Sequence, residues 1–409
     1  MQEMTGMKSE LDEIKDKTEQ YILGNYKRYD LAFEYGVGEL LFDTENRQYI
    51  DFFCGISVTN LGHGEADIID ALRTQADKLF HTSNLFYSRS TALLAEALVV
   101  NSFPSKVFFC NSGTEANEAA FKLARKYGVE KGIERPVVLS LKNGFHGRSF
   151  GSMSITGQEK IHKGFGELAS GVDYVQPNDE TDLHQKFQKY KGRVAAFFME
   201  PIIGEGGIIP IEREFAEVVR NLCKEAGALL VFDEIQTGMG RTGKLFAYEH
   251  YGFTPDIMTL AKGLGSGFPI GAVLIADSYA GILGPGAHGS TFGGNPLAAA
   301  VAYETLKVIL SRDVLKHTAA ISDYMFTHLN IMKSKYSIIR EVRGVGLHIG
   351  LDLSIPSGPV VEDCMKNGLL LNSTANTVIR IMPPLNVSLE RVNEALGILE
   401  DSISRFQNK

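Results

Sequence analysis

The sequence has few cysteines, and the four it has lie far apart. Cys54, Cys110, Cys223 and Cys364 form no C-x-x-C pair. Disulfide scaffolds and zinc ribbons need closely spaced cysteines, so this scarcity argues against both. Unpaired cysteines are typical of the reducing cytosol. We therefore expect a cytoplasmic protein without a metal site.

Long apolar runs and an excess of positive charge are also missing. No segment approaches the roughly 18 consecutive apolar residues of a membrane-spanning helix. The first 17 residues mix acidic and basic side chains without an apolar stretch, so we expect no secretory signal. The 41 Lys and Arg residues face 49 Asp and Glu, a net charge of −8. This balance argues against broad binding to nucleic acid or to an anionic membrane.

Glycine, in contrast, is abundant. The chain of 409 residues contains 42 glycines, against about 29 expected at the average usage of roughly 7%. They gather at 204–207, 238–240, 263–267 and 293–294. Glycines at the ends of segments mark tight turns or places where the backbone approaches a ligand closely.

Short apolar runs alternate with helical patterns through the middle of the chain. Runs that read as buried strands are 107–110, 137–139, 194–199, 229–232 and 272–275, and the helical patterns cover 115–127 and 215–226. Buried strands separated by helices predict an α/β fold with a mostly parallel sheet covered on both faces. A ligand then binds beyond the carboxyl ends of the strands.

The two ends of the chain have a different pattern. They mix helices, such as 300–310, with short strands, and we find no internal repeat or long linker. We expect a large domain at 61–300 and a smaller, discontinuous α+β domain from 1–60 and 301–409.

Two turns follow apolar runs and carry candidate ligand contacts. Ser112, Gly113 and Thr114 open a helix, where backbone N–H groups and the helix dipole favour phosphate. Simple N-capping explains the same residues. Phe145 stands on a glycine-flanked turn and could stack on a flat ring or merely cover the core.

An acid and a lysine occupy the corresponding places after two further runs. Asp233 ends an apolar strand, where a charged form needs a partner; a protonated ring nitrogen and a magnesium ion are the alternatives. Lys262 stands between an apolar run and a glycine-rich turn. A buried lysine has a lowered pKa and forms Schiff bases with carbonyls, whereas an ordinary lysine is a solvated surface charge.

Four independent structural roles do not explain this combination, which describes a pyridoxal phosphate site. The surrounding strings resemble class III aminotransferases of fold type I, most closely the acetylornithine and ornithine aminotransferases. These strings are FFCNSGTEANEAAFKLARKYG, NGFHGRSFGSMSITG, MEPIIGEGG, LLVFDEIQTGMG, TLAKGLGSGFPIGA, HGSTFGGNP and VIRIMPPL, spread over most of the span 20–385. The resemblance implies the fold type I architecture and pyridoxal 5′-phosphate as cofactor.

The resemblance also implies a role for each cofactor contact. Lys262 would form the internal aldimine and later carry a proton between substrate and cofactor carbons. Asp233 would keep the pyridine nitrogen protonated, Gln236 would bond the phenolic oxygen and Phe145 would stack on the ring. The phosphate would be held by Ser112, Gly113 and Thr114.

By the same resemblance, the enzyme is a homodimer with shared active sites. Thr291 would add a phosphate contact in the neighbouring subunit's site, and Ser290 would lie close to substrate. Tyr26 aligns with a tyrosine that contacts substrate in the ornithine enzymes.

Two arginines carry the substrate assignment. Arginine pairs bidentately with carboxylates, and Arg148 and Arg380 match the arginines that bind the carboxylates of glutamate and 2-oxoglutarate. In the ornithine branch, a glutamate at the Glu205 position pairs with the second arginine and releases it when glutamate binds.

We therefore expect transfer of the terminal amino group of N-acetylornithine to 2-oxoglutarate, giving glutamate and a semialdehyde, in arginine biosynthesis. Ornithine, succinylornithine and 4-aminobutyrate are alternative donors. The family commonly has glutamine where this chain has Ile203, a difference that could alter the choice of donor.

Two alternatives of other classes are weighed against this hypothesis. Residues 238–243 match G-x-G-x-x-G and, with Lys244, nearly form a Walker A loop, but Leu245 replaces the Ser or Thr that binds magnesium. A nucleotide-binding enzyme is thus a remote alternative. The other is a non-catalytic regulatory protein that keeps the fold.

Overall fold

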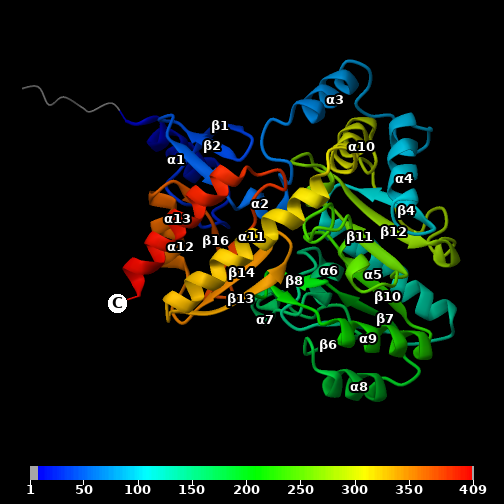
Figure 1. Ribbon diagram of the computed structural model, residues 1–409. Helices are drawn as coiled ribbons and strands as arrows, with labels where there is room; N and C mark the ends of the chain where they lie inside the picture. Colours follow the sequence, from blue (N-terminus) through cyan, green and yellow to red (C-terminus); the bar gives the residue numbers. More distant parts are fainter. Residues whose placement is uncertain (1–7, 408–409) are drawn as a thin grey trace, which may run out of the picture.

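A seven-stranded sheet forms the centre of the larger part of the molecule (Figure 1). The computed structural model describes residues 8–407; the first seven residues of the segment expected to lack a signal lie outside this range. In spatial order the strands are β4 (Ser105–Cys110), β12 (Gly271–Ala276), β11 (Ile257–Leu260), β10 (Leu229–Asp233), β7 (Val194–Met199), β5 (Val137–Leu141) and β6 (Val172–Val175).

The strands of this sheet run parallel with one exception. β12 is antiparallel to both of its neighbours, β11 and β4, while the other pairs are parallel. The expected mostly parallel α/β sheet is confirmed. The reversal of the run at 272–275 was not predicted, because a continuous apolar run shows burial and carries no information on strand direction.

Helices cover both faces of the sheet because successive strand residues point to opposite sides. On β7, Phe197 packs in the hydrophobic cluster that includes α9 (Arg213–Ala226), whereas Phe198 packs with α5 (Gly113–Glu130). The same alternation occurs on β10, which contacts both helices. Two apolar layers thus hold the sheet rigidly between α5 and α9, as the helical patterns in the sequence indicated.

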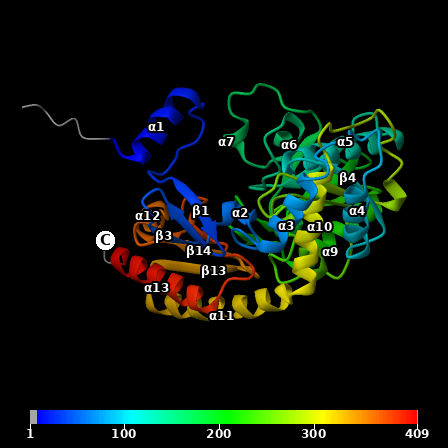
Figure 2. The same cartoon turned by 90° about the horizontal axis from the view of Figure 1, so that it is seen from above.

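Segments from both ends of the chain form the smaller part of the molecule (Figures 1 and 2). Its two sheets have the orders β1-β2-β3-β15 and β13-β14-β17-β16. The strands are β1 (Phe33–Val37), β2 (Leu40–Asp43), β3 (Gln48–Asp51), β13 (Ile339–Val345), β14 (His348–Leu353), β15 (Leu369–Leu370), β16 (Asn372–Thr374) and β17 (Val378–Ile381). Because β15 pairs in parallel with β3, a late segment completes a sheet that begins near the N-terminus.

Three helices near the C-terminus pack against these sheets. They are α11 (Val314–Lys335), α12 (Gly358–Lys366) and α13 (Leu389–Phe406). α11 packs on β13 and on α13, and Figure 2 shows these two helices along one side of the smaller part.

One helix links the two parts. α10 (Pro296–Ser311) begins after the N-cap Asn295 and packs on α3 (Ala66–Ala76) and α4 (Arg89–Val100). The expected domain boundary between residues 300 and 301 therefore falls inside a continuous helix.

Shorter elements surround the sheets. They are α1 (Glu10–Tyr21), α2 (Cys54–Ser57), α6 (Phe150–Ile155), α7 (Glu159–His162), α8 (Glu180–Lys189), β8 (Ile202–Ile203), β9 (Ile209–Pro210) and the 3-10 turns η1 (Ala247–His250), η2 (Lys262–Leu264) and η3 (Asp277–Tyr279). Across residues 8–407, no helix joins the length and the apolar character that crossing a bilayer demands.

Candidate active site

A cavity of about 360 Å³ lies at the carboxyl edge of the seven-stranded sheet. This is where parallel α/β sheets bind their ligands, because the loops after successive strands meet there. The predicted residues that line it follow four different strands, and they are Ser112, Gly113, Thr114, Phe145, Arg148, Asp233, Gln236 and Lys262. The four sequence motifs are thus brought together in one place.

Lys262 borders this cavity immediately beyond β11. Its backbone has φ of +47°, in the left-handed region that non-glycine residues rarely adopt. Burial lowers the pKa of Lys262 to about 8, and the positive charge of Arg380 acts in the same direction, although Glu205 opposes the shift. The neutral, nucleophilic form of this amine is therefore more accessible near neutral pH than it is for a solvated lysine.

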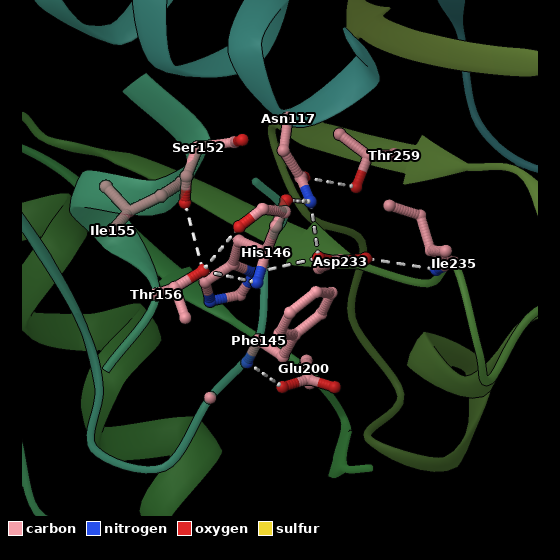
Figure 3. Close-up of polar contacts among 12 residues, drawn as sticks. Asn117, Phe145, His146, Ser152, Ile155, Thr156, Glu200, Asp233, Ile235 and Thr259 are labelled. Carbon is pink, nitrogen blue, oxygen red and sulfur yellow. Dashed lines mark hydrogen bonds and ion pairs between the residues drawn. The ribbon is translucent and has the colours of Figure 1, made fainter. Parts of the chain in front are cut away.

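Asp233 is the last residue of β10 and is 3% exposed. Its Oδ2 accepts a hydrogen bond from the side-chain amide of Asn117 at 2.7 Å and lies 2.8 Å from Nδ1 of His146. Its Oδ1 accepts from the backbone N–H of Ile235 at 3.1 Å (Figure 3). Three donors from three segments fix this carboxylate, and it faces the same cavity as Lys262.

The partners of Asp233 were not predicted as site residues. Burial opposes the charged form of His146, but the hydrogen bond and the negative charge of Asp233 outweigh it and raise the pKa of this imidazole. Asn117 is held in turn, because its Oδ1 accepts from Thr259 at 2.9 Å. Both residues stand inside strings quoted for the family resemblance, NSGTEAN and NGFHGR, but only the fold shows that they meet at one acid.

The start of α5 also lines the cavity. Ser112 caps this helix, since its hydroxyl accepts from the backbone N–H of Glu115. A Cβ at Gly113 would come within 2.7 Å of Ile235, and one at Gly147 would collide with Thr114. Close packing against these neighbours explains both glycines. Ser112, Gly113 and Thr114 line the cavity at the N-terminal end of α5, where a phosphate is bound favourably. The residues present fit a flat ring that carries a phosphate.

Thr114 also has a local structural function. Its hydroxyl accepts from the backbone N–H groups of Arg148 and Ser149, at 3.0 and 3.1 Å. The turn that carries Phe145 is thus anchored to the first turn of α5, next to the cavity.

Arg380 and Glu205 form an ion pair beside the cavity. Arg380 is on β17 and is 1% exposed; its Nη1 lies 2.6 Å from Oε1 of Glu205. Burial opposes ionisation of Glu205, but the charge and hydrogen bond of Arg380 hold the pKa of Glu205 below its usual value. Gln236 joins the pair, with its amide nitrogen 3.4 Å from Glu205 and its amide oxygen 3.5 Å from Arg380. Nε and Nη2 of Arg380 donate to the side chain of Asn372.

Arg148 differs from Arg380 because it is exposed and holds no ion pair within residues 8–407. Its guanidinium lies 5.7 Å from the centre of the Phe145 ring. A free guanidinium at the mouth of the cavity is available to an incoming carboxylate.

Besides Glu205 and Arg380, which lie beside it, three predicted residues do not line this cavity. Tyr26 is 71% exposed, and Thr291 is also exposed. Ser290 borders a second cavity of about 490 Å³, although its hydroxyl accepts from Asn111, which lines the first. Ile203, the departure from the family pattern, is fully buried on β8 and does not reach the cavity either.

The glycine motif at 238–243 has a structural function. No helix starts within it, and a Cβ at Gly240 would lie 2.9 Å from Leu385. Arg241 is fully buried and donates to Ser57, to Asn60 and to two backbone carbonyl groups. The backbone of this motif is therefore packed against protein and leaves no open phosphate cradle, which argues against the nucleotide-binding alternative.

Comparison with known proteins agrees with this site. The family model for aminotransferase class-III matches residues 23–403. The chain belongs to this family of pyridoxal phosphate-dependent transaminases, so the enzyme class, the cofactor and the fold expected from the sequence are confirmed.

Individual relatives and solved structures within this family are similar to the chain over nearly its whole length. The chain is 44% identical to the acetylornithine aminotransferase of Clostridium acetobutylicum, over 94% of this chain and all of that protein. It is 41% identical to that of Methanocaldococcus jannaschii, over 96% and 98%. Among solved structures, the ornithine aminotransferase of Toxoplasma gondii has a TM-score of 0.93 at 32% identity, with 99% and 97% of the two chains covered. The N-acetylornithine aminotransferase of Stenotrophomonas maltophilia K279a has a TM-score of 0.83 at 37% identity, with 96% and 98% covered.

Proposed function

We propose that the protein transfers the terminal amino group of N-acetylornithine to 2-oxoglutarate, giving glutamate and the corresponding semialdehyde. Relatives named acetylornithine aminotransferase, 41–44% identical over nearly the whole chain, support this donor. The structural observation that carries the proposal is that Lys262 and Asp233 face one cavity beside the Glu205–Arg380 ion pair. Arginine biosynthesis in the cytoplasm is the proposed setting.

Bound pyridoxal phosphate supplies an aromatic ring that accepts the electron pair left when a carbon loses its proton. Lys262 would hold the aldehyde carbon of the cofactor in the resting enzyme. Its amine, once the substrate amine has taken its place, would move the proton at the amine-bearing carbon of the substrate. Asp233 holds a proton on the pyridine nitrogen, with its own position fixed by Asn117 and His146. Phe145 packs on the ring and excludes water from that face.

The remaining cofactor contacts lie at the edges of the ring. Gln236 would donate to its phenolic oxygen. The phosphate is bound at the start of α5 by the backbone and hydroxyl groups of Ser112, Gly113 and Thr114.

The two arginines orient the substrate. N-acetylornithine and glutamate each carry a carboxylate distant from the reacting amine, and Arg148 binds this carboxylate. Glu205 neutralises Arg380 while the donor's uncharged arm is present and releases it to the second carboxylate of glutamate or 2-oxoglutarate. One pocket thus accepts a neutral arm and a carboxylate in turn. Ornithine is the second candidate donor, because several similar solved structures are ornithine aminotransferases.

A homodimer with shared sites accounts for Tyr26, Ser290 and Thr291, which do not line the cavity. Large apolar side chains are exposed around the second cavity, including Leu85, Phe86, Tyr87 and Phe292. Contiguous apolar surface of this kind marks an interface. In a dimer, Thr291 of one subunit reaches the phosphate of the other, with Ser290 and Tyr26 near the shared substrate site.

The chain organisation is proposed as one large cofactor-binding domain, 61–300, and one smaller domain from 1–60 and 301–409. The shared sheet of β3 and β15 supports the discontinuous domain. Because α10 is continuous through residue 300, the proposed boundary passes through a helix that joins the two domains.

Borohydride reduction of the purified protein, followed by peptide mapping, tests the cofactor role of Lys262. We expect the reduced pyridoxyl label on Lys262, and a label absent from this residue contradicts the proposal. Half-reactions with N-acetylornithine, N-succinylornithine, ornithine and 4-aminobutyrate then identify the donor. N-acetylornithine is expected to have the highest kcat/KM.

A further inference from the structure

Glu200 is a buried carboxyl group that the proposed chemistry does not use. It follows β7 directly, is 4% exposed and borders the cavity. Burial raises the pKa of Glu200 to about 7; His146 opposes this shift, and Asp233 adds to it. Burying an ionisable group costs stability unless its oxygen atoms find donors.

The two oxygen atoms of Glu200 bind two different loops. Oε1 accepts from the backbone N–H of Phe145 at 2.8 Å, as Figure 3 shows, and Oε2 accepts from the backbone N–H of Gly204 at 3.1 Å. The first loop carries Phe145, the ring proposed to pack on the cofactor. The second carries Glu205, the partner of Arg380.

The loop at 204–208 is fixed on its other side by the smaller part of the molecule. Thr374 donates to the backbone carbonyl of Glu205 at 2.8 Å, and Arg343 donates to those of Gly207 and Ile208. This loop therefore bridges the two parts of the chain, and Glu200 connects it to the larger part.

We propose that Glu200 is a positioning residue: one carboxylate fixes Phe145 relative to Glu205 and so keeps Glu205 on Arg380 while the donor without a second carboxylate is bound. The inference rests on the proposed function and adds a determinant of donor preference to it. The side chain acts through its two N–H contacts and takes no part in proton transfer.

Glu200→Gln removes one of these contacts with little change in volume. A carboxylate presents two acceptors, whereas an amide presents one acceptor and an NH₂ group that opposes the second N–H. Glu200→Ala removes both. Hydrogen exchange followed by mass spectrometry, on protein with and without pyridoxal phosphate, reports on residues 143–148 and 203–208. Relative to wild type, we expect backbone amide hydrogens to exchange roughly tenfold faster in one of these two segments for Glu200→Gln and in both segments for Glu200→Ala.

Glu234→Gln is the matched control. Glu234 is 1% exposed, its pKa is raised to about 7 by burial, and it accepts from the backbone N–H groups of Ala247 and Tyr248, each at 2.7 Å. It does not line the cavity. Its replacement is expected to speed exchange around 246–249 and to leave the two Glu200 segments as in wild type.

Half-reaction kinetics separate positioning from general destabilisation. Glu200→Gln is expected to lower kcat/KM for N-acetylornithine about tenfold more than kcat/KM for glutamate, because glutamate supplies its own partner for Arg380. The Glu234 control is expected to change both equally. Equal losses in Glu200→Gln, or unchanged exchange in both segments, would overturn the inference. Wild-type protein that fails to bind pyridoxal phosphate would instead overturn the proposed function.

Discussion

The two sides of the cavity hold their charges in different ways. On the cofactor side, Asp233 receives three hydrogen bonds from the larger part of the molecule and is nearly inaccessible. On the substrate side, Arg380 comes from the smaller part and is paired with Glu205, while Arg148 has no ion-pair partner among the described residues. A charge that keeps one ligand can be fixed by several donors. A charge that receives different ligands needs a partner that it can exchange.

The largest effect is expected at the group that both sides share. Lys262→Ala removes the amine that binds the cofactor and moves the proton, so transaminase activity should fall at least about a thousandfold. The visible absorbance of bound cofactor and the rate of the half-reaction measure this. Lys244→Ala is the control, because Lys244 is exposed on the near-Walker turn. Loss of activity in this variant alone would revive the nucleotide-binding alternative.

A substitution of Asp233, on the cofactor side, should lower the stability of the fold as well as the affinity for the cofactor. In Asp233→Asn, the NH₂ group would face either both Asn117 and His146 or the backbone N–H of Ile235. The free energy of unfolding should therefore fall by about 2–3 kcal/mol, and cofactor binding should weaken. Urea unfolding and cofactor titration measure the two effects. Asp256→Asn is a control for strand-end carboxyls, because Asp256 accepts from Leu230 outside the cavity. Cofactor affinity unaffected by Asp233→Asn would argue against the assigned role.

A substitution of Glu205, on the substrate side, should instead change the preference between the two substrates. Glu205→Gln weakens the partner that neutralises Arg380, so kcat/KM for the amino donor should fall about tenfold more than kcat/KM for glutamate. Stability should change little, since the amide still fits. Separate half-reactions give the two values, and equal losses would refute the exchange of partners.

The smallest effect is a change in the pH dependence of stability. The pKa of His146 is raised above its ordinary value of about 6.5. Its contribution is therefore fully present below that pH and is lost as pH rises through the folded-state pKa. The free energy of unfolding, measured with urea from pH 5.5 to 9, should therefore decline as pH rises. His146→Asn should remove the part of this decline that comes from His146. Identical slopes in both proteins would show that His146 stays neutral.

The sequence predicted the groups of the cavity better than it predicted their supports. Lys262 and Asp233 stand at the ends of apolar runs, and such a run is a local pattern that can be recognised from the sequence alone. Asn117 and His146 bind Asp233, and Glu200 binds Phe145, through hydrogen bonds to residues 55–116 positions away, which no local pattern shows. Strand positions were predictable for the same reason, whereas the reversed direction of β12 depends on pairing across the sheet.

That reversal determines how the wall of the cavity is built. A parallel strand after β11 would need a crossover of a dozen or more residues and would begin at the far edge of the sheet. Because β12 runs the other way, the chain turns back within residues 261–270. Residues 267–270 then lead into β12 at the same edge of the sheet as Lys262. The connection between β11 and β12 therefore supplies both the reactive amine and a further part of the cavity wall.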